Sequence, residues 1–406
     1  MPDKNNINTN LPLSGLRVLD FGQFIAGPVC AALLADLGAD VIRVERIGGN
    51  PDRYVTPLDK SLPDVGAMYA FANRNKRSIA LNLTDASARE VFERLLMTSD
   101  AVVTNMSQRA LQKLGLDLPA LQRIKPTIVA SNVTAYGNEG PWKMRTGFDG
   151  MAQAISGAMH MSGENGNPRK SYVHFVDFYA GAISAIGLLA SLLQRQTKGV
   201  AVGVETSLLA SAMMMMNSVF AEEGVLHPDR AGIGNRAHSG GPADTFETSD
   251  GTIILQVLGN AKFALLCKLI GHDELASDAR FATDNLRGHN ADTLNPIVQA
   301  WCRSLTSEEC VDRLTEAGLC AAPVLSPLQA LDHPQIKQHS SLHKIHYPEA
   351  DIHVPTFLPI DVDGERSAAA PAPQLGVHSN EILRELGYST AEIDEFVKSG
   401  VTAIKP

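Results

Sequence analysis

The sequence predicts an α/β protein with a doubly wound, Rossmann-like large domain and a smaller α+β domain. Between residues 16 and 133, apolar strand-like segments alternate with helical segments, which is the pattern of a parallel sheet covered by helices on both faces. Hydrophobic residues make up 44% and charged residues 19% of the 406 residues, which suits a chain with a large buried core. This length exceeds the size at which a single core closes easily, so more than one domain is expected.

The first strand–helix–strand unit occupies residues 16–45. A strand is expected at 16–21, a helix at 29–38 that ends at Gly38, and a second strand at 39–45. The segments that continue this pattern are strands at 77–83, 100–105 and 127–133, and helices at 85–99 (capped by Asp85 or Ser87), 108–115 and 118–125. Ligands of such sheets bind at the carboxyl ends of the strands.

After residue 150 the pattern becomes more helical. The expected elements are helices at 151–163 and 178–196, a strand at 200–204, and a helix at 208–220 capped by Thr206 or Ser207. Four consecutive methionines, Met213 to Met216, lie in the last helix. Methionine is apolar and flexible, so we expect these residues to fill core or subunit-interface space.

A change in composition near Glu222 indicates a domain boundary, because Gly, Pro and polar residues become frequent there. A hairpin with an Asp-Gly turn is expected at 244–257, followed by helices from 261 to about 318. Residues 333–355 are predicted to be an extended connection, and short helices are predicted at 380–387 and 390–400. The predicted domains are therefore a large domain at 1–220, a small domain at 221–332, and a C-terminal segment at 333–406 that returns to the large domain.

Charge and cysteine usage exclude several classes of partner. The net charge of −9 argues against a nucleic-acid surface, which needs clustered cations. The five cysteines are scattered without a C-x-x-C pair, which is typical of reduced thiols. The N-terminal segment lacks an apolar core, and no stretch has the roughly 20 uninterrupted apolar residues of a membrane span. We expect a cytoplasmic protein with no membrane partner.

Familiar motifs for nucleotides, metals and hydrolysis are missing. The loop "GQFIAGP" after the first strand matches neither G-x-G-x-x-G nor a P-loop, and it is most simply a strand-to-helix turn, although a phosphate could bind at the helix start. Five histidines lie within residues 333–353, but their spacing matches no zinc pattern, so no metal is expected. No G-x-S-x-G elbow supplies a serine nucleophile.

Asp177 is a carboxylate between apolar residues in "HFVDFYAGA". Its simplest interpretation is the N-cap of the long helix that follows. The apolar neighbours Phe175, Val176 and Phe178 shelter it, while the small residues of "YAGA" would let another molecule approach the backbone. A sheltered carboxylate beside a helix dipole is expected to stay ionised and weakly solvated, which suits a nucleophile.

The chain resembles the family III CoA-transferases (CaiB/BaiF family). The blocks that carry the resemblance, in order, are "LGADVIRVER", "NRNKRSIALNL", "GFDGMAQAISG", the "VDF" that precedes an Ala/Gly-rich helix, and "SDGTIILQVLG". The resemblance implies that Asp177 attacks an acyl-CoA donor to form a mixed anhydride and then an aspartyl-CoA thioester, from which a carboxylate acceptor takes CoA. It also implies that the large domain binds CoA and that the chain forms an interlocked homodimer. No permanently bound cofactor is implied, since coenzyme A and its acyl thioesters are substrates.

The resemblance assigns CoA contacts to one set of positions in the large domain. They are Ile25, Ala26, Arg46, Leu81, Asn82, Leu83, Thr84, Asn105, Met106 and Lys113. Thr134 replaces a lysine of the family's pattern, which leaves that contact open. The segment "HSGG" is short for the family's substrate-covering loop, so Gly240 and Gly241 are expected either to contact substrate or to form an ordinary turn.

Two alternatives to transfer remain. An acyl-CoA racemase of the same fold would need a histidine where this chain has Phe148, and phenylalanine cannot move a proton, so transfer is favoured. The neighbouring Asp149 is expected to be structural. A non-catalytic acyl-CoA-binding protein would use Asp177 only as a helix cap. The sequence does not specify which donor and acceptor acids are used.

Overall fold

The computed structural model describes residues 11–362 and 369–404, and the remaining positions of the predicted domains lie outside the description. The chain divides into two units. Unit 1 runs to Ala158, continues through Ser171–Leu226 and resumes from His339. Unit 2 comprises Met159–Lys170 and His227–Gln338, so residues 159–170 group with unit 2, whereas the sequence places them within the large domain.

Unit 1 is built on a seven-stranded sheet. In sheet order the strands are β12 (Thr402–Ala403), β3 (Lys76–Leu81), β2 (Asp40–Glu45), β1 (Arg17–Asp20), β4 (Ala101–Thr104), β5 (Val129–Thr134) and β6 (Gly203–Ser207). All neighbours are parallel except β12, which is antiparallel to β3. The strand order reverses on either side of β1, which confirms the doubly wound α/β fold expected from the sequence.

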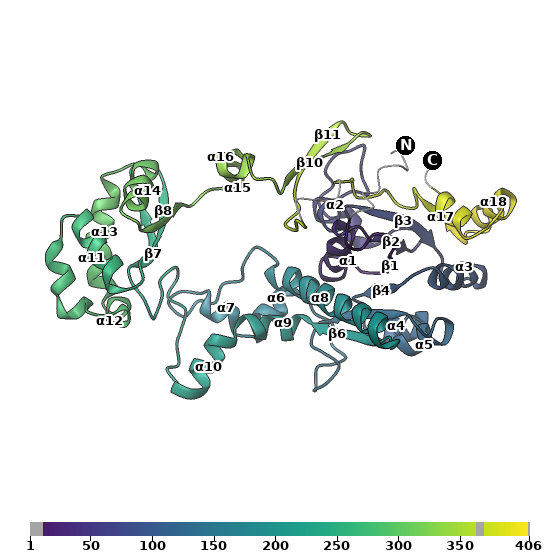
Figure 1. The fold of residues 1–406 in the computed structure, drawn as a ribbon, viewed down its shortest axis with the longest axis horizontal. Coiled ribbons are helices and arrows are strands. Elements are labelled where there is room, and N and C mark those ends of the chain that lie inside the picture. Colours follow the sequence, from purple (N-terminus) through teal and green to yellow (C-terminus); the bar gives the residue numbers. More distant parts are fainter. Residues whose placement is uncertain (1–10, 363–368, 405–406) are drawn as a thin grey trace. The chain divides into compact units, whose positions relative to one another are not determined.

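Helices cover both faces of this sheet (Figure 1). The helical elements of unit 1 are α1 (Ala26–Asp36), η2 (Pro51–Tyr54), α2 (Ala67–Ala72), α3 (Ala86–Met97), α4 (Gln108–Leu114), α5 (Leu118–Ile124), α6 (Asp149–Ile155), α8 (Phe175–Lys198), α9 (Leu208–Met215), α10 (Asn217–Leu226), α17 (Ser379–Glu385) and α18 (Thr390–Lys398). Alternate residues of each strand face opposite cores: Val18 packs with α1 and α8, and Leu19 packs with α3, α17 and α18.

Capping side chains and glycines mark several helix ends in unit 1. Asp85 caps α3 by accepting hydrogen bonds from the backbone N–H groups of Ser87 and Ala88. Ser207 caps α9 through the N–H of Ala210. Gly199 ends α8 in the left-handed conformation, with φ at 70°.

The helix predicted at 151–163 is two helices. Helix α6 ends at Ile155, and α7 (Ala158–Met161) follows after Gly157, whose φ of 83° cannot continue a helix. The extended connection predicted at 333–355 is also wrong. It contains the short helix α16 (Pro334–Lys337) and the antiparallel hairpin of β10 (Leu342–Tyr347) and β11 (Ile352–Phe357).

Unit 2 combines a three-stranded antiparallel sheet with helices. The strands are β7 (Ala243–Glu247), β8 (Thr252–Gln256) and β9 (Cys320–Pro323), which confirms the predicted hairpin and extends it. Besides α16 and most of α7, its helical elements are α11 (Asn260–Leu269), η3 (Asp273–Ser277), η4 (Ala279–Phe281), α12 (Asp284–His289), α13 (Ala291–Arg303), α14 (Ser307–Glu316) and α15 (Pro327–Asp332). Unit 2 has its own core, which includes Phe246, Phe263 and Leu294.

The apolar helices α9 and α8 differ from what the sequence predicts. Met213, Met214 and Met215 are between 45% and 55% exposed in unit 1, so they do not fill its core, while the interface alternative stays open. Helix α8 is long and apolar enough to cross a membrane by length and composition, so the expectation that no stretch has this character is wrong. Half of its apolar window is buried, and α8 packs against α1 and β5 as a core helix does.

Candidate functional site

A cavity of about 560 Å³ opens in unit 1 at the carboxyl ends of the parallel strands. Its walls come from the loop after β1, the end of β2, and the segments that follow β3, β4 and β5. Because the strand order reverses between β1 and β4, the cavity lies at the position where doubly wound folds bind ligands.

The cavity brings together most of the positions predicted to bind CoA. The predicted residues in its wall are Ile25, Ala26, Arg46, Leu81, Asn82, Leu83, Thr84, Asn105 and Met106, together with Asp177. Lys113 is not among the lining residues, although Ala110 and Leu114 of the same helix α4 are. Thr134 also lines the cavity, and its hydroxyl accepts a hydrogen bond from the N–H of Gly137 at 3.0 Å.

The glycines Gly240 and Gly241 belong to unit 2 and are buried there. The carbonyl of Gly241 accepts a hydrogen bond from Nε of Arg287 at 2.9 Å. A Cβ at Gly241 would lie 3.1 Å from the carbonyl carbon of Arg287, so this glycine serves close packing within unit 2. Its contact with substrate stays a prediction.

Asp177 lies in the first turn of α8 and is 9% exposed. It is not the N-cap of this helix, as its simplest interpretation from sequence requires. The N-cap is His174, which makes no side-chain cap hydrogen bond. Asp149 performs the capping from α6, because its Oδ2 accepts hydrogen bonds from the backbone N–H groups of Val176 at 2.9 Å and Asp177 at 3.2 Å. This geometry gives Asp149 a structural function.

Asp149 is itself held in place. Its Oδ1 accepts a hydrogen bond from the side-chain amide of Gln153, and Oε1 of Gln153 accepts one from the N–H of Ser171 at 2.9 Å. Asp149 is only 1% exposed. The start of α8, and with it the backbone of Asp177, is therefore anchored to α6.

The electrostatics of Asp177 also differ from expectation. Burial, and secondarily the charge of Asp149, raise the pKa of the Asp177 carboxyl from 3.8 to about 7. Two N–H groups at the start of α8 donate to Asp149 and not to Asp177. Among the described residues, no hydrogen bond to the Asp177 carboxylate lowers its pKa. The sequence predicts a carboxylate that stays ionised, whereas the structure gives a group that changes its charge near neutral pH.

Aromatic and small residues surround Asp177. Phe178 packs edge-to-face on Phe71, with 5.5 Å between ring centroids. Phe148 lines the cavity and packs edge-to-face on Phe24 at the same centroid distance. Gly181 does not leave space for a substrate, because a Cβ there would lie 2.8 Å from the backbone oxygen of Ala26. Its small size serves the packing of α8 on α1.

Two of the predicted CoA contacts also hold loops of the cavity. The side chain of Asn105 forms two hydrogen bonds with the backbone of Gln23. Its Oδ1 accepts one from the Gln23 N–H at 2.8 Å, and its Nδ2 donates one to the Gln23 carbonyl at 2.7 Å. Nε of Arg46 donates to the carbonyl of Gly49 at 2.6 Å. Arg46 is exposed, and within residues 11–362 and 369–404 its guanidinium makes no other hydrogen bond, so the group can face an anionic ligand.

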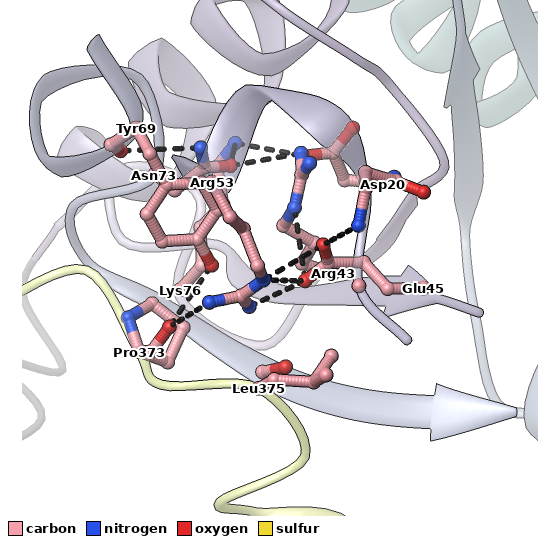
Figure 2. A network of polar contacts seen from close by, with 12 residues as sticks. Asp20, Arg43, Glu45, Arg53, Tyr69, Asn73, Lys76, Pro373 and Leu375 are labelled. Carbon is pink, nitrogen blue, oxygen red and sulfur yellow. Dashed lines mark hydrogen bonds and ion pairs between the residues drawn. The ribbon is translucent and has the colours of Figure 1, made fainter. Parts of the chain in front are cut away.

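A buried charge network beside the cavity was missed by sequence reasoning (Figure 2). Arg43 in β2 forms ion pairs with Asp20 at 3.5 Å and Asp52 at 2.8 Å. Arg53 binds Glu45, which lines the cavity. The available signal was the segment "VIRVE", in which Arg43 and Glu45 stand among apolar residues of a buried strand.

The chain is similar to known proteins over nearly its whole length. The model of CoA-transferase family III matches residues 13–379. Human succinyl-CoA:glutarate CoA-transferase is 30% identical over 98% of this chain and 91% of its own length. The beta subunit of succinyl-CoA–L-malate CoA-transferase from Chloroflexus aurantiacus is 30% identical over 95% of this chain and 97% of its own. A crystal structure of a CaiB/BaiF family protein from Brucella suis is similar with a TM-score of 0.83 and 29% identity, covering 93% of this chain and 100% of that one.

Proposed function

This chain belongs to CoA-transferase family III and is an enzyme that transfers CoA, and we propose that Asp177 is the residue that carries the transferred group. The observation that carries the proposal is the position of Asp177. It is buried in the wall of the same cavity that contains nine of the ten positions expected to contact CoA. A thioester bound there would present its carbonyl to a sheltered carboxylate.

The proposed reaction passes through two anhydrides. The Asp177 carboxylate attacks the carbonyl carbon of the donor thioester, and CoA leaves as thiolate to give an aspartyl mixed anhydride. The thiolate then attacks the aspartyl carbonyl, which releases the donor acid and leaves an aspartyl-CoA thioester. The acceptor carboxylate attacks this thioester to form a second anhydride and free thiolate. Attack of the thiolate on the acceptor carbonyl gives the new acyl-CoA and restores Asp177.

The surroundings of Asp177 suit these steps. Its raised pKa makes the ionised carboxylate a stronger nucleophile than an exposed aspartate, provided that the pH is near or above 7. The anchoring by Asp149 fixes the backbone of Asp177 during attack. Apolar neighbours such as Phe178 and Leu208 limit the water that would hydrolyse an anhydride.

The racemase alternative gains no support from the cavity. Phe148 occupies the cavity wall with an apolar ring packed on Phe24, and such a ring cannot return a proton to carbon. Deuterium incorporation at the α-carbon of a branched acyl-CoA would revive this alternative.

The names of the relatives suggest a substrate class. Both curated relatives described above act with succinyl-CoA according to their names, so we propose succinyl-CoA as donor and a small dicarboxylate as acceptor. We further propose a cytoplasmic homodimer in which Gly240 and Gly241 contribute to substrate binding.

The test is a steady-state screen. Succinyl-, acetyl- and longer acyl-CoA donors are assayed against dicarboxylates and carnitine-like acids, with wild type and Asp177→Ala in parallel. We expect turnover with at least one pair and a loss of about 10³-fold or more in Asp177→Ala, because the variant lacks the nucleophile. Full turnover in Asp177→Ala would end the proposal.

A further inference from the structure

The loop that joins β1 to α1 supplies a continuous part of the cavity wall. Gln23, Phe24, Ile25 and Ala26 all line the cavity. Phe24 has a φ of 59°, a left-handed conformation that is costly for an aromatic residue by about 1–3 kcal/mol and persists only where the surroundings impose it. The loop therefore requires firm anchors at its two ends.

Those anchors are Asp20 and Lys76. At the first end of the loop, Oδ1 of Asp20 accepts a hydrogen bond from the N–H of Gly22 at 2.7 Å. Just past the other end, in the first turn of α1, the carbonyl of Pro28 accepts a hydrogen bond from Nζ of Lys76 at 2.8 Å. The ammonium group also binds Oδ2 of Asp20 at 2.7 Å, so a single ion pair ties the two ends of the loop together.

The packing between the loop ends leaves little freedom. A Cβ on Gly22 would lie 2.6 Å from Cδ of Pro28 and 2.8 Å from Oδ1 of Asp20. The third hydrogen bond of Lys76 goes to Oδ1 of Asn73 at 2.9 Å, which satisfies all three protons of the ammonium. Asp20 is fully buried and Lys76 is 4% exposed, so water does not compete for these bonds.

We propose that Lys76 and Asp20 are positioning residues of the CoA site: their buried ion pair holds residues 22–28, which comprise the loop and the first turn of α1, in the shape that receives the CoA thioester. This inference rests on the proposed function, because it assumes that the cavity binds CoA. A buried ion pair seldom stabilises a fold more than apolar residues of the same size. Here Asp20 bonds to the start of the binding loop and Lys76 bonds to the first turn of α1 that follows it. This arrangement indicates that the ion pair fixes the conformation of the loop.

The charges around the pair are consistent with this function. Burial lowers the pKa of Lys76 to about 8 although Asp20 opposes the shift. Burial also acts to raise the pKa of Asp20, but Lys76 and Arg43 outweigh it and the pKa falls below its usual 3.8. Arg43 shares the Asn73 side-chain oxygen with Lys76 and pairs with Glu45 at 3.2 Å, which connects the pair to the rest of the network in Figure 2.

The test measures CoA binding directly by titration calorimetry, together with kcat and KM for the acyl-CoA donor. The double variant Lys76→Met/Asp20→Asn removes both charges while keeping similar side-chain volumes. We expect its Kd for CoA and its KM for the donor to rise about 10- to 100-fold, because a displacement of about 1 Å in a binding loop has effects of this size.

A matched control comes from the same unit. The Arg74–Asp36 ion pair is as buried, with side chains 1% and 3% exposed, and neither residue lines the cavity. Arg74→Met/Asp36→Asn is expected to change the free energy of unfolding while leaving Kd for CoA within about twofold of wild type. Equal effects of the two double variants on Kd would show that the Lys76 pair is merely structural.

A second variant covers the case in which the double variant does not fold. Lys76→Arg keeps the charge, but its planar guanidinium cannot bond to Asp20, Asn73 and Pro28 in the geometry of an ammonium. We expect weaker CoA binding by Lys76→Arg as well. Wild-type affinity in this variant, or in a folded double variant, would overturn the positioning function. Failure of the wild-type protein to bind CoA would instead overturn the proposed function.

Discussion

Replacement of Asp177 by asparagine should stabilise the fold, and the gain should depend on pH. The substitution keeps the size of the side chain and removes its ionisation. In the folded protein, burial and Asp149 raise the pKa of Asp177 to about 7, compared with 3.8 for an exposed aspartate. Above pH 7 the native state must therefore hold a charge that the unfolded chain accommodates easily, whereas asparagine imposes no such cost.

The size of the effect follows from linkage. Each pKa unit corresponds to about 1.36 kcal/mol, so the difference between 3.8 and about 7 gives an upper value of about 4 kcal/mol above pH 8. Because the folded pKa is raised, the relative stability of wild type is greatest below pH 3.8 and is lost as the pH rises through 7. Between pH 5 and pH 8, the advantage of Asp177→Asn should grow by about 2.5 kcal/mol.

Urea denaturation at fixed protein concentration from pH 5 to pH 9 measures this difference. Asp312→Asn, on an exposed position of α14, is the control and should follow wild type within about 0.5 kcal/mol. A stability difference between wild type and Asp177→Asn that stays constant with pH would refute the raised pKa. If Asp177→Asn were less stable than wild type at pH 8, the burial of an ionised Asp177 would not destabilise the fold, contrary to the prediction.

Three further outcomes are expected. The kcat/KM of transfer should rise with pH through about 7 as Asp177 ionises, and a profile that is flat from pH 5.5 to 8.5 would exclude this group. Asp149→Asn should lower the pKa of Asp177 and move the pH profile of kcat/KM to lower pH, and an unmoved profile would count against coupling between the two carboxyl groups. The same variant should lose about 1 kcal/mol in the free energy of unfolding, because the cap of α8 is weakened. Gly181→Ala should destabilise by about 1–3 kcal/mol because its Cβ meets the Ala26 oxygen, whereas wild-type stability would show that α8 is loosely packed there.

The elements of the large sheet were predictable because their signals are local. The strands expected at 39–45 and 100–105 match β2 and β4 within a residue at each end, since buried parallel strands form short apolar runs. The hairpin β10–β11 was missed because its histidines and prolines suggest a loop. The alternation that buries Ile345 and Tyr347 was the signal that could have revealed it.

The candidate site was predictable only in part. Nine CoA positions fall in one cavity because the loops that carry them follow neighbouring parallel strands. The cap on α8 could not be predicted from local sequence, since Asp149 is 28 residues from Asp177 and meets it only in the folded chain. The polar segment "NRNKRS" gives no local sign that Lys76 is buried, and only the three-dimensional structure shows that its ammonium lies between Asp20 and the first turn of α1.

The covalent state of Asp177 tests the central claim most directly. Wild type and Asp177→Asn are incubated with succinyl-CoA without acceptor, treated with hydroxylamine, digested and analysed by mass spectrometry. We expect a hydroxamate on Asp177 in wild type and none in the variant, because both the anhydride and the aspartyl thioester react with hydroxylamine. An active wild-type enzyme that forms no adduct at Asp177 with any donor that it turns over would contradict the mechanism.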